Sequence, residues 1–197
     1  AQITAQFTKS FKGGDFSKGK NLLIFEVAKK YVSNFIDFEI KEVKAGHKII
    51  IQHLEADLGI SVEVPGLDFP VRVGGKVDRI DHYNGQLRII DYKTGKVEQK
   101  DLVVSNWEKI RQEYSFSKAF QVLTYALIYN DTAPFTGAFG GIISFKNLGK
   151  GFLKFTEKTD KKDATITQET LVLFKKQLVA LIQEICDMSI DFQEKEV

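Results

Sequence analysis

Apolar residues recur at helical spacing in the first quarter of the chain. They lie three or four positions apart between residues 21 and 44: Leu23, Val27, Tyr31, Phe35 and Phe38. This period predicts one long helix or two abutting helices, and Gly46 follows where a helix commonly ends. Residues 1–20 show no such period and contain scattered glycines and lysines, so we expect a loop or a frayed end there.

Beyond Gly46 the apolar period changes to two, which is typical of β-strands. Four strands are predicted: from His47 to a turn at Gly59, from Ile60 to Val64, from about Phe69 to His82 and from Gln86 to Lys93. The last two are joined by Asn84-Gly85, a pair that favours a two-residue hairpin loop. The middle of the chain is therefore predicted to be an antiparallel meander.

The second half of the chain alternates helical and extended patterns. A helix is expected from Ser117, a candidate N-cap, to about Asn130, and an amphipathic helix from about Thr167 to Met188. The apolar stripe of the last helix is predicted to hold five residues: Leu171, Phe174, Leu178, Leu181 and Ile185. Two strands are expected between these helices, within residues 136–147 and 150–158. Residues 97–115 show no pattern that assigns them.

This order of elements predicts an α/β (α+β) fold, in which helices flank a central mixed sheet that contains the antiparallel meander. With 197 residues, 43% of them hydrophobic and 27% charged, the chain has an ordinary globular composition. We expect a loop and helical extension over residues 1–46 and one compact domain over residues 47–197. The chain starts at Ala1 and its single methionine is Met188, so we expect a fragment of a longer protein.

Charge and cysteine content exclude several classes of function. The formal net charge is only +2, so a nucleic-acid partner would have to be held by a local basic surface. Cys186 is the single cysteine, which excludes an internal disulfide and any iron-sulfur cluster or zinc site held by four cysteines of this chain. No apolar run reaches the roughly 18 residues that span a bilayer. We therefore expect a cytoplasmic protein with no membrane partner.

The Asn84-Gly85 loop fixes the register of its hairpin. It sets Tyr83 opposite Gln86, and each further step pairs one residue from either strand. Three of the resulting pairs carry charge: Asp78 with Asp91, Lys76 with Lys93, and Asp81 with Arg88. Because side chains alternate along a strand, the first two pairs share one face of the hairpin. The third pair is expected to form an ion pair on the other face.

Asp78 and Asp91 are the candidates for chemistry. Directly opposed Cβ atoms are about 4.5 to 5.5 Å apart, and like charges so placed destabilise a sheet. A hard divalent cation, Mg²⁺ or Mn²⁺, would compensate them, with waters, a substrate phosphate and the backbone carbonyl of Tyr92 as further ligands. Lys93 would orient or deprotonate a water and stabilise the charge of a phosphorane-like transition state. The alternative is a solvated hairpin face on which lysines screen an accidental pair of acids.

Three stretches resemble the C-terminal motifs of the PD-(D/E)xK nuclease superfamily, in its RecB-like and AddB-like branch: GGKVDRID, LRIIDYKTGK and QVLTYALIY. The resemblance covers about residues 47–146 and implies a restriction-endonuclease-like core. It also implies that Asp78 and Asp91 bind metal and that Lys93 is catalytic. The implied activity is that of a Mg²⁺- or Mn²⁺-dependent DNA exonuclease domain. Such a domain belongs to a bacterial helicase-nuclease and works beside a helicase partner in DNA repair.

The same resemblance implies supporting residues. Gln121 and Tyr125 lie four positions apart on one helix face, where they would hydrogen-bond toward Lys93 or the backbone of a strand. The alternative is an amphipathic helix with one polar boundary residue and a core tyrosine. Arg79 and Lys96 would contact DNA phosphates or simply solubilise the edge of the sheet.

The resemblance also implies a third acidic ligand on an early strand. Glu55 is the preferred candidate and Glu63 the second, and each has an equal alternative as a surface carboxylate. Relatives of this branch commonly carry a histidine ligand on an N-terminal helix, and this sequence shows no such motif. Its three histidines are expected to be satisfied or solvated rather than ligands, with His53 the best placed of them: His47, His53 and His82.

Two other functions are compatible with these residues. A nuclease-derived fold that binds DNA or docks a helicase partner without turnover would fit the missing histidine and the modest net charge. A restriction-type endonuclease would use the same metal site. The Q-x-x-x-Y pattern favours the exonuclease branch by analogy alone.

Overall fold

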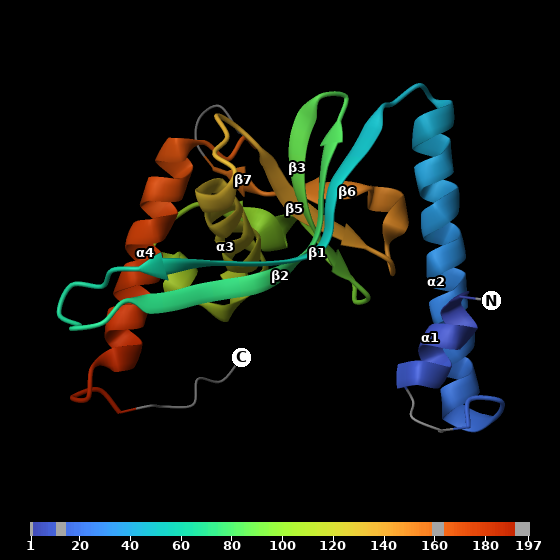
Figure 1. The fold of residues 1–197 in the computed structure, drawn as a ribbon, viewed down its shortest axis with the longest axis horizontal. Coiled ribbons are helices and arrows are strands. Elements are labelled where there is room, and N and C mark those ends of the chain that lie inside the picture. Colours follow the sequence, from blue (N-terminus) through green and yellow to red (C-terminus); the bar gives the residue numbers. More distant parts are fainter. Residues whose placement is uncertain (1, 11–14, 159–163, 192–197) are drawn as a thin grey trace. The chain divides into compact units, whose positions relative to one another are not determined.

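The computed structural model describes residues 2–10, 15–158 and 164–191 of the chain (Figure 1). The chain divides into two compact units, Ala1–His47 and Lys48–Val197. This division falls one residue beyond the boundary expected from the sequence. No helix in the described ranges is long and apolar enough to cross a membrane.

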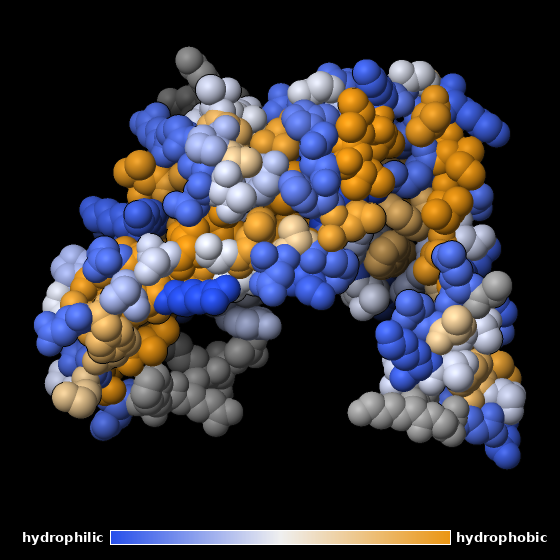
Figure 2. Space-filling model, viewed as in Figure 1, coloured by the Kyte–Doolittle hydropathy of each residue, from blue (hydrophilic) through white to orange (hydrophobic). Residues whose placement is uncertain are grey.

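The first unit consists of the helices α1 (Gln2–Ser10) and α2 (Gly19–Lys44). The predicted long helix is confirmed as one uninterrupted element of 26 residues. Charged and apolar side chains alternate along its surface (Figure 2), and Leu23 is 65% exposed.

The prediction of a loop over residues 1–20 is wrong for Gln2–Ser10, which form α1. The ring of Phe7 packs edge-on against the rings of Phe16 and Phe25, with centroids 5.8 and 5.0 Å away. These aromatic contacts give a short helix of weak local pattern a tertiary partner. The part of the expected loop at residues 11–14 lies outside the described residues.

The second unit is built on a five-stranded sheet in the order β1-β2-β3-β5-β6. Its strands are β1 (Ile49–Val62), β2 (Val71–Tyr83), β3 (Gln86–Lys93), β5 (Phe139–Ser144) and β6 (Phe152–Lys154). Neighbouring strands run antiparallel, except that β3 and β5 are parallel. A separate parallel pair joins β4 (Val103–Val104) to β7 (Thr156–Glu157). The predicted mixed sheet with an antiparallel meander is confirmed.

Helix α3 (Ser117–Thr132) makes the crossover between the parallel strands β3 and β5 and packs on the sheet (Figure 1). Parallel neighbours need a crossover of this kind. Helix α4 (Gln168–Cys186) packs on α3, where the rings of Phe120 and Phe174 meet edge-on with centroids 5.0 Å apart. The hydrophobic core of the unit therefore lies between the sheet and these two helices.

The connections that had no sequence pattern form short 3₁₀ helices. The described part of the chain contains η1 (Gln99–Leu102), η2 (Glu108–Arg111), η3 (Tyr114–Phe116) and η4 (Leu148–Lys150). The turn η3 leads directly into α3, so that Phe116 occupies the N-cap position and Ser117 is already helical. The predicted N-cap at Ser117 is therefore wrong, although the predicted span of the helix is confirmed.

The last helix buries most of its predicted apolar stripe. Three of the five residues are buried: Leu171, Phe174 and Leu178. Ile185 is 53% exposed, because the helix ends at Cys186 and its last turn lies beyond the core.

The predicted register of the hairpin formed by β2 and β3 is confirmed from the turn as far as Arg79 and Ile90. The ladder runs from the turn residues Tyr83 and Gln86 to Arg79 and Ile90. Within the loop Asn84-Gly85, both residues have positive φ, 52° and 85°, as a type I′ turn requires.

Strand β1 is one continuous strand and not two. Gly59, expected to mark a turn, lies in the ladder opposite Gly74. The strands approach closely here, since a Cβ on Gly74 would lie only 3.0 Å from the carbonyl oxygen of Leu58. The chain reverses direction later, between Val62 and Val71.

Strand β2 leaves β3 at Asp78, and we call this point the fork. The ladder between β2 and β3 ends at Arg79 and Ile90, while the ladder between β1 and β2 continues well beyond it. Past the fork the β1–β2 hairpin extends alone toward α4 (Figure 1), where Gln183 Nε2 donates to the carbonyl of Pro65 at 2.8 Å.

The inward-facing residues change at the fork. In the outer part of β2 the odd-numbered Val73 and Val77 pack against the core, whereas on the other side of Asp78 the even-numbered Ile80 does so. In β1, Glu55 has a φ of 52°, and the ladder to β2 shifts register between Ile51 and His53. Strict alternation of side chains therefore fails at the fork.

The end of the ladder between β2 and β3 leaves two predicted pairs unformed, because Asp78 and Asp91 also lie beyond its last pair. Lys76 does not lie opposite Lys93, because β2 no longer pairs with β3 at that level. Lys76 instead pairs in the ladder with Asp57 of β1.

Candidate active site

At the fork, Asp78 of β2 contacts strand β3. Asp78 Oδ2 accepts a hydrogen bond from the backbone N–H of Tyr92 at 2.7 Å. The side chain thus satisfies a donor of β3 at the point where the regular ladder has ended. This bond holds the Asp78 carboxylate in place where the two strands separate.

Asp91 is buried on β3, with 3% of its surface exposed. The Nζ of Lys93 lies 3.0 Å from Oδ1 and 2.8 Å from Oδ2 of this carboxylate. Only the contact to Oδ1 has the geometry of a hydrogen bond, and Oδ2 is buried without a hydrogen-bond donor. This second oxygen is close to a positive charge, yet its lone pairs remain open to a further ligand.

The environment of Asp91 disfavours its ionised form. Burial raises the pKa of Asp91 above its ordinary value of 3.8, and the hydrogen bond and charge of Lys93 oppose that rise. The Asp78 carboxylate raises the pKa further, so the two acids are close enough to repel each other. A divalent cation shared by both acids would stabilise their ionised forms.

Lys93 has a second partner on α3. Its Nζ donates to Gln121 Oε1 at 2.8 Å, and Gln121 Nε2 donates to the hydroxyl of Tyr125 at 2.8 Å. A protonated lysine has three N–H donors, and Asp91 and Gln121 take two of them. The Lys93 side chain is 31% exposed, so its third donor is accessible to a ligand.

Tyr125 packs between α3 and β2. A Cβ on Gly75 would lie 3.2 Å from its ring, so the absence of a side chain there allows the close approach. Burial is the main cause that raises the pKa of the Tyr125 hydroxyl above 10.0, and the hydrogen bond from Gln121 opposes it. The hydroxyl is therefore neutral at physiological pH and anchors the Gln121 side chain.

The oxygen atoms at the fork fit a hard divalent cation. The protein would supply only part of the coordination shell of that cation. Carboxylate oxygens are ligands that Mg²⁺ and Mn²⁺ prefer, and the buried Oδ2 of Asp91 is the observation that favours a cation here. The N–H of Tyr92 points toward Asp78 on β2, and a strand residue directs its carbonyl to the same edge. Asp78, Asp91 and the Tyr92 carbonyl would therefore hold the ion.

Among the described residues, no third acidic or histidine side chain joins the two aspartates. Within the residues that the structure describes, no group of three or more His, Cys, Asp or Glu side chains could hold a metal ion. Waters and phosphate oxygens of a substrate would complete the coordination, as is usual for Mg²⁺.

Neither glutamate proposed as a third ligand joins the two aspartates. Glu55 forms an exposed ion pair with Lys76, with 3.3 Å between Oε2 and Nζ. Glu63 is exposed and follows the end of β1, far along the hairpin from the fork. Both are therefore surface carboxylates.

Only one of the two residues expected to contact phosphates is accessible. Arg79 is 2% exposed and its Nε donates to Asp81 Oδ2 at 2.7 Å, so the expectation that it reaches DNA or solubilises the sheet edge is wrong. Lys96 follows β3 with its side chain 61% exposed, and its Nζ lies 2.7 Å from Glu98. The hydrogen bond between them raises the pKa of Lys96 and lowers the pKa of Glu98.

The histidines have surroundings that differ from a metal site. His53 is exposed, and its ring lies 6.1 Å from the ring of Tyr129 on α3. His47 and His82 are half-buried. In the described ranges none of them belongs to a metal-binding group.

Sequence patterns missed the residues that fix the loop after β3. Asn147 Nδ2 donates to the carbonyl of Val97 at 2.7 Å, and the Val97 N–H donates back to Asn147 Oδ1 at 3.3 Å. Ser144 Oγ donates to the carbonyl of Gly95 at 2.7 Å. The partners of the Asn147 bonds are 50 positions apart, so no local pattern indicates them. These bonds anchor the segment that follows Lys93 on the end of β5.

Comparison with known families covers nearly the whole chain. A model of the PD-(D/E)XK nuclease superfamily matches residues 5–196, which include part of α1, all of α2 and the fork. A comparison with curated proteins finds no match. The match extends over far more than half of the sequence and contains Asp78, Asp91 and Lys93 at the fork. The chain therefore belongs to the PD-(D/E)XK nuclease superfamily.

Proposed function

We propose that this chain is a Mg²⁺- or Mn²⁺-dependent DNA exonuclease domain that hydrolyses phosphodiester bonds. The observation that carries the proposal is the arrangement at the fork. There a buried carboxylate with an open oxygen, Asp91, lies beside Asp78 and against the ammonium of Lys93, which Gln121 holds from α3. Membership of a nuclease superfamily supports the same reaction class.

Each residue at the fork has a distinct task in this proposal. Asp78 and Asp91 hold the divalent ion, which when bound supplies Lewis-acid polarisation of a phosphoryl oxygen. Lys93 uses its third N–H to orient the attacking water, and its charge lies where negative charge develops on the phosphoryl oxygens. Gln121 and Tyr125 keep the ammonium of Lys93 from rotating away.

The finer assignment places the domain in a bacterial helicase-nuclease that acts in DNA repair. The resemblance of three sequence stretches to RecB-like and AddB-like nucleases supports it, including the pair Gln121 and Tyr125 on α3. A helicase domain or subunit would then supply the DNA strand. Lys96, exposed after β3, is proposed to contact the phosphates of that strand.

A second candidate is a nuclease-fold module that binds DNA or docks a helicase without turnover. The observation that favours it is the acidic shell of only two aspartates, since the described residues offer no group of three metal-binding side chains. Such a module would retain DNA binding and lack cleavage with any metal.

Cleavage of linear DNA tests the proposed function. With Mg²⁺ or Mn²⁺ the chain is expected to degrade linear DNA and to leave covalently closed circles intact. Lys93→Ala should lower the rate about 10²- to 10³-fold, because it removes a charge placed at the transition state. Lys175→Ala, which removes an exposed lysine of α4, is the control and should keep the parent rate. Equal rates in Lys93→Ala and the parent would contradict the proposal, and an inactive parent that binds DNA would favour the second candidate.

A further inference from the structure

The side chain of Tyr92 lies on the other face of the sheet from the side chains of Asp91 and Lys93. Tyr92 is the residue between them on β3, and successive side chains of a strand point to opposite faces. Lys93 faces α3, where Gln121 accepts its hydrogen bond. Tyr92 therefore takes part in the fork through its backbone, while its ring lies in a different environment.

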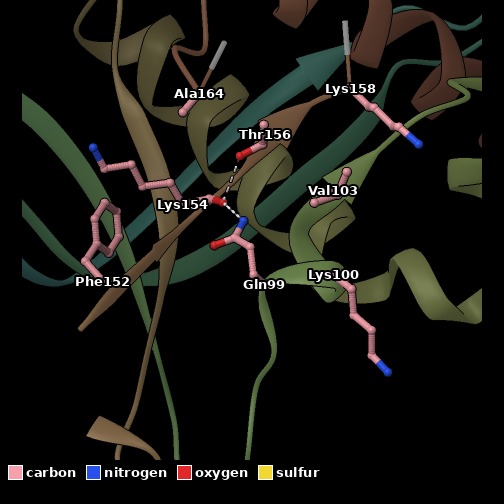
Figure 3. A pocket seen from close by; sticks show the side chains of 8 residues that line it. All are labelled: Gln99, Lys100, Val103, Phe152, Lys154, Thr156, Lys158 and Ala164. Atoms are coloured by element: carbon pink, nitrogen blue, oxygen red, sulfur yellow. Dashed lines mark hydrogen bonds between the residues drawn. The ribbon is translucent and has the colours of Figure 1, made fainter. Parts of the chain in front are cut away.

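Basic and aromatic side chains cover this second face. The guanidinium of Arg88 lies over the ring of Phe152, 5.4 Å from its centroid, and the ammonium of Lys154 lies over the ring of Phe139 at 3.8 Å. Phe152 and Lys154 also line a cavity of about 640 Å³ beside β6 (Figure 3). The sheet lies between these side chains and Asp91. A side chain on this face therefore influences the fork through the backbone of the strands.

The Tyr92 hydroxyl is bonded to the strand that leaves the fork. Arg79 of β2 donates from Nη1 to this hydroxyl at 3.2 Å, and from Nε to Asp81 at 2.7 Å. Arg79 pairs with Ile90 in the last step of the ladder, and Tyr92 is two residues further along β3. The two side chains are thus diagonal neighbours on one face of the sheet. The bond ties β3 to β2 beyond their last regular pair.

An aromatic ring holds Tyr92 from the other neighbouring strand. Phe145 directly follows β5, and its ring stacks on the ring of Tyr92 with centroids 5.5 Å apart and an interplanar angle of 27°. The Phe145 N–H also donates to the carbonyl of Lys93 at 2.9 Å. The Tyr92 side chain is therefore held on two sides, by the stacked ring and by the guanidinium at its hydroxyl.

These contacts fix the backbone that forms the metal site. The Tyr92 N–H donates to Asp78 Oδ2 at 2.7 Å, and the Tyr92 carbonyl is a proposed ligand of the ion. Arg79 is the residue after Asp78, so its bond to the hydroxyl and the bond from the Tyr92 N–H to Asp78 close a ring between the two strands. Outward movement of β2 would break both bonds. The position of Asp78 relative to β3 is therefore set in part from the opposite face of the sheet.

We propose that Tyr92 and Arg79 are positioning residues that match the fork to a small divalent ion. Their bond holds the strands close enough for Asp78 and Asp91 to share an ion such as Mg²⁺ or Mn²⁺. Mg²⁺ requires near-ideal octahedral geometry with ligands at about 2.0 to 2.1 Å, whereas Ca²⁺ accepts variable geometry at about 2.3 to 2.6 Å. Loss of the bond should therefore weaken binding of the smaller ions more. This inference rests on the proposed function, since it takes the acids of the fork to hold a metal ion.

Titration calorimetry with Mn²⁺ and with Ca²⁺ on the full chain compares the parent with Tyr92→Phe. The variant removes the hydroxyl and keeps the ring that stacks on Phe145. Its affinity for Mn²⁺ should fall about tenfold, as is typical when a group that orients a metal ligand is lost. Its affinity for Ca²⁺ should fall by a smaller factor. Tyr114→Phe, which removes an exposed hydroxyl on η3, is the control and should bind both ions as the parent does.

A second variant approaches the same residue from β5. Phe145→Leu leaves the hydroxyl of Tyr92 bonded to Arg79 but removes the stacked ring, and it should change the ratio of Mn²⁺ to Ca²⁺ affinity in the same direction. Thermal unfolding of each metal-free variant shows which of them are folded. If Tyr92→Phe does not fold, the ratio measured for Phe145→Leu decides.

Two results in a folded variant would overturn the inference. One is Mn²⁺ affinity equal to that of the parent. The other is an equal loss of affinity for both ions, which would reduce Tyr92 to a general structural role. A parent that binds neither ion would contradict the metal site of the proposed function as well, so the parent titration separates the failure of one from the failure of the other.

Discussion

The hairpin of β2 and β3 carries two charged clusters that differ in how completely the oxygens of their buried aspartates are hydrogen-bonded. At the fork, Asp91 has one oxygen without a hydrogen bond, and Lys93 is 31% exposed. A few residues toward the turn, Asp81 is fully buried and both of its oxygens accept hydrogen bonds from arginine. We call this second group the arginine cluster, which consists of Arg79, Asp81 and Arg88.

The arginine cluster has the geometry of a structural ion pair. Arg88 binds Asp81 through two bonds of 2.7 Å, from Nε to Oδ1 and from Nη2 to Oδ2. Arg79 adds a bond of 2.7 Å to Oδ2 and donates from Nη1 to the Tyr92 hydroxyl at 3.2 Å. The ion pair that the sequence predicted between Asp81 and Arg88 is confirmed. On this hairpin, we propose that an incompletely hydrogen-bonded acid marks the metal site, whereas an acid whose two oxygens both accept hydrogen bonds is structural.

Removal of the central carboxylate of the arginine cluster should have the largest effect. Asp81→Ala leaves two buried guanidinium groups without their shared acceptor and is expected to lower the free energy of unfolding by about 3 to 5 kcal/mol. Denaturant unfolding measures it. Glu113→Ala breaks an exposed pair with Lys109 on the surface of the same unit and should cost only about 0.3 to 0.5 kcal/mol. Similar losses in the two variants would erase the distinction between the clusters.

Neutralising Asp91 at the fork should lower the activity without lowering the stability. Asp91→Asn removes a metal ligand, and the rate of DNA cleavage should fall about 10²- to 10³-fold. The folded protein binds a proton on Asp91 more tightly than the unfolded chain does, because the folded pKa is raised above 3.8. The contribution of Asp91 to stability therefore decreases as pH rises above 3.8, and ionised Asp91 destabilises the fold at neutral pH.

The same variant gives a stability readout. Asp91→Asn should be at least as stable as the parent at pH 7, and its advantage should shrink as the pH is lowered toward 4. Thermal unfolding across this pH range measures the difference. A large loss of stability at neutral pH would instead place Asp91 with the arginine cluster as a structural acid.

Loss of the hydrogen bond between Lys93 and Gln121 of α3 should have the smallest effect. Gln121→Ala frees the ammonium of Lys93 and should lower kcat about tenfold with little change in KM, since the substrate still binds while the lysine is less well oriented. Thr124→Ala, which removes a hydroxyl bonded to the Phe120 carbonyl on the same helix, is the control. If Gln121→Ala acted only through stability, its loss of activity would disappear at low temperature, and the role in positioning Lys93 would be refuted.

The register of this hairpin was predictable because a two-residue loop at Asn84-Gly85 leaves no freedom in pairing. The sequence therefore predicted that Asp81 meets Arg88. The same rule failed for Lys76 and Lys93, because it assumes that two strands stay paired along their length. Departure of β2 at Asp78 depends on the packing of the outer hairpin against α3 and α4, which no local pattern encodes.

The residues of the site were likewise predicted only in part, because some of their contacts depend on segments far apart in the sequence. The resemblance drew attention to Gln121, and the crossover through α3 places that residue over β3 beside Lys93. Arg79 is next to Asp78 in the sequence, yet it turns to the opposite cluster, so proximity along the chain misled the assignment. Glu55 fitted a period of two, but its side chain forms an exposed ion pair with Lys76 and does not join the two aspartates.

Metal binding tests the central claim most directly. Titration calorimetry with Mn²⁺ should show binding to the parent that is lost when Asp78→Asn and Asp91→Asn are combined, since these two side chains are the only acids proposed to hold the ion. Glu63→Gln, which neutralises an exposed acid far along the hairpin, should bind Mn²⁺ as the parent does. Loss of binding in the double variant alone is the predicted result. Mn²⁺ binding that persists unchanged without both aspartates would contradict a metal site at the fork.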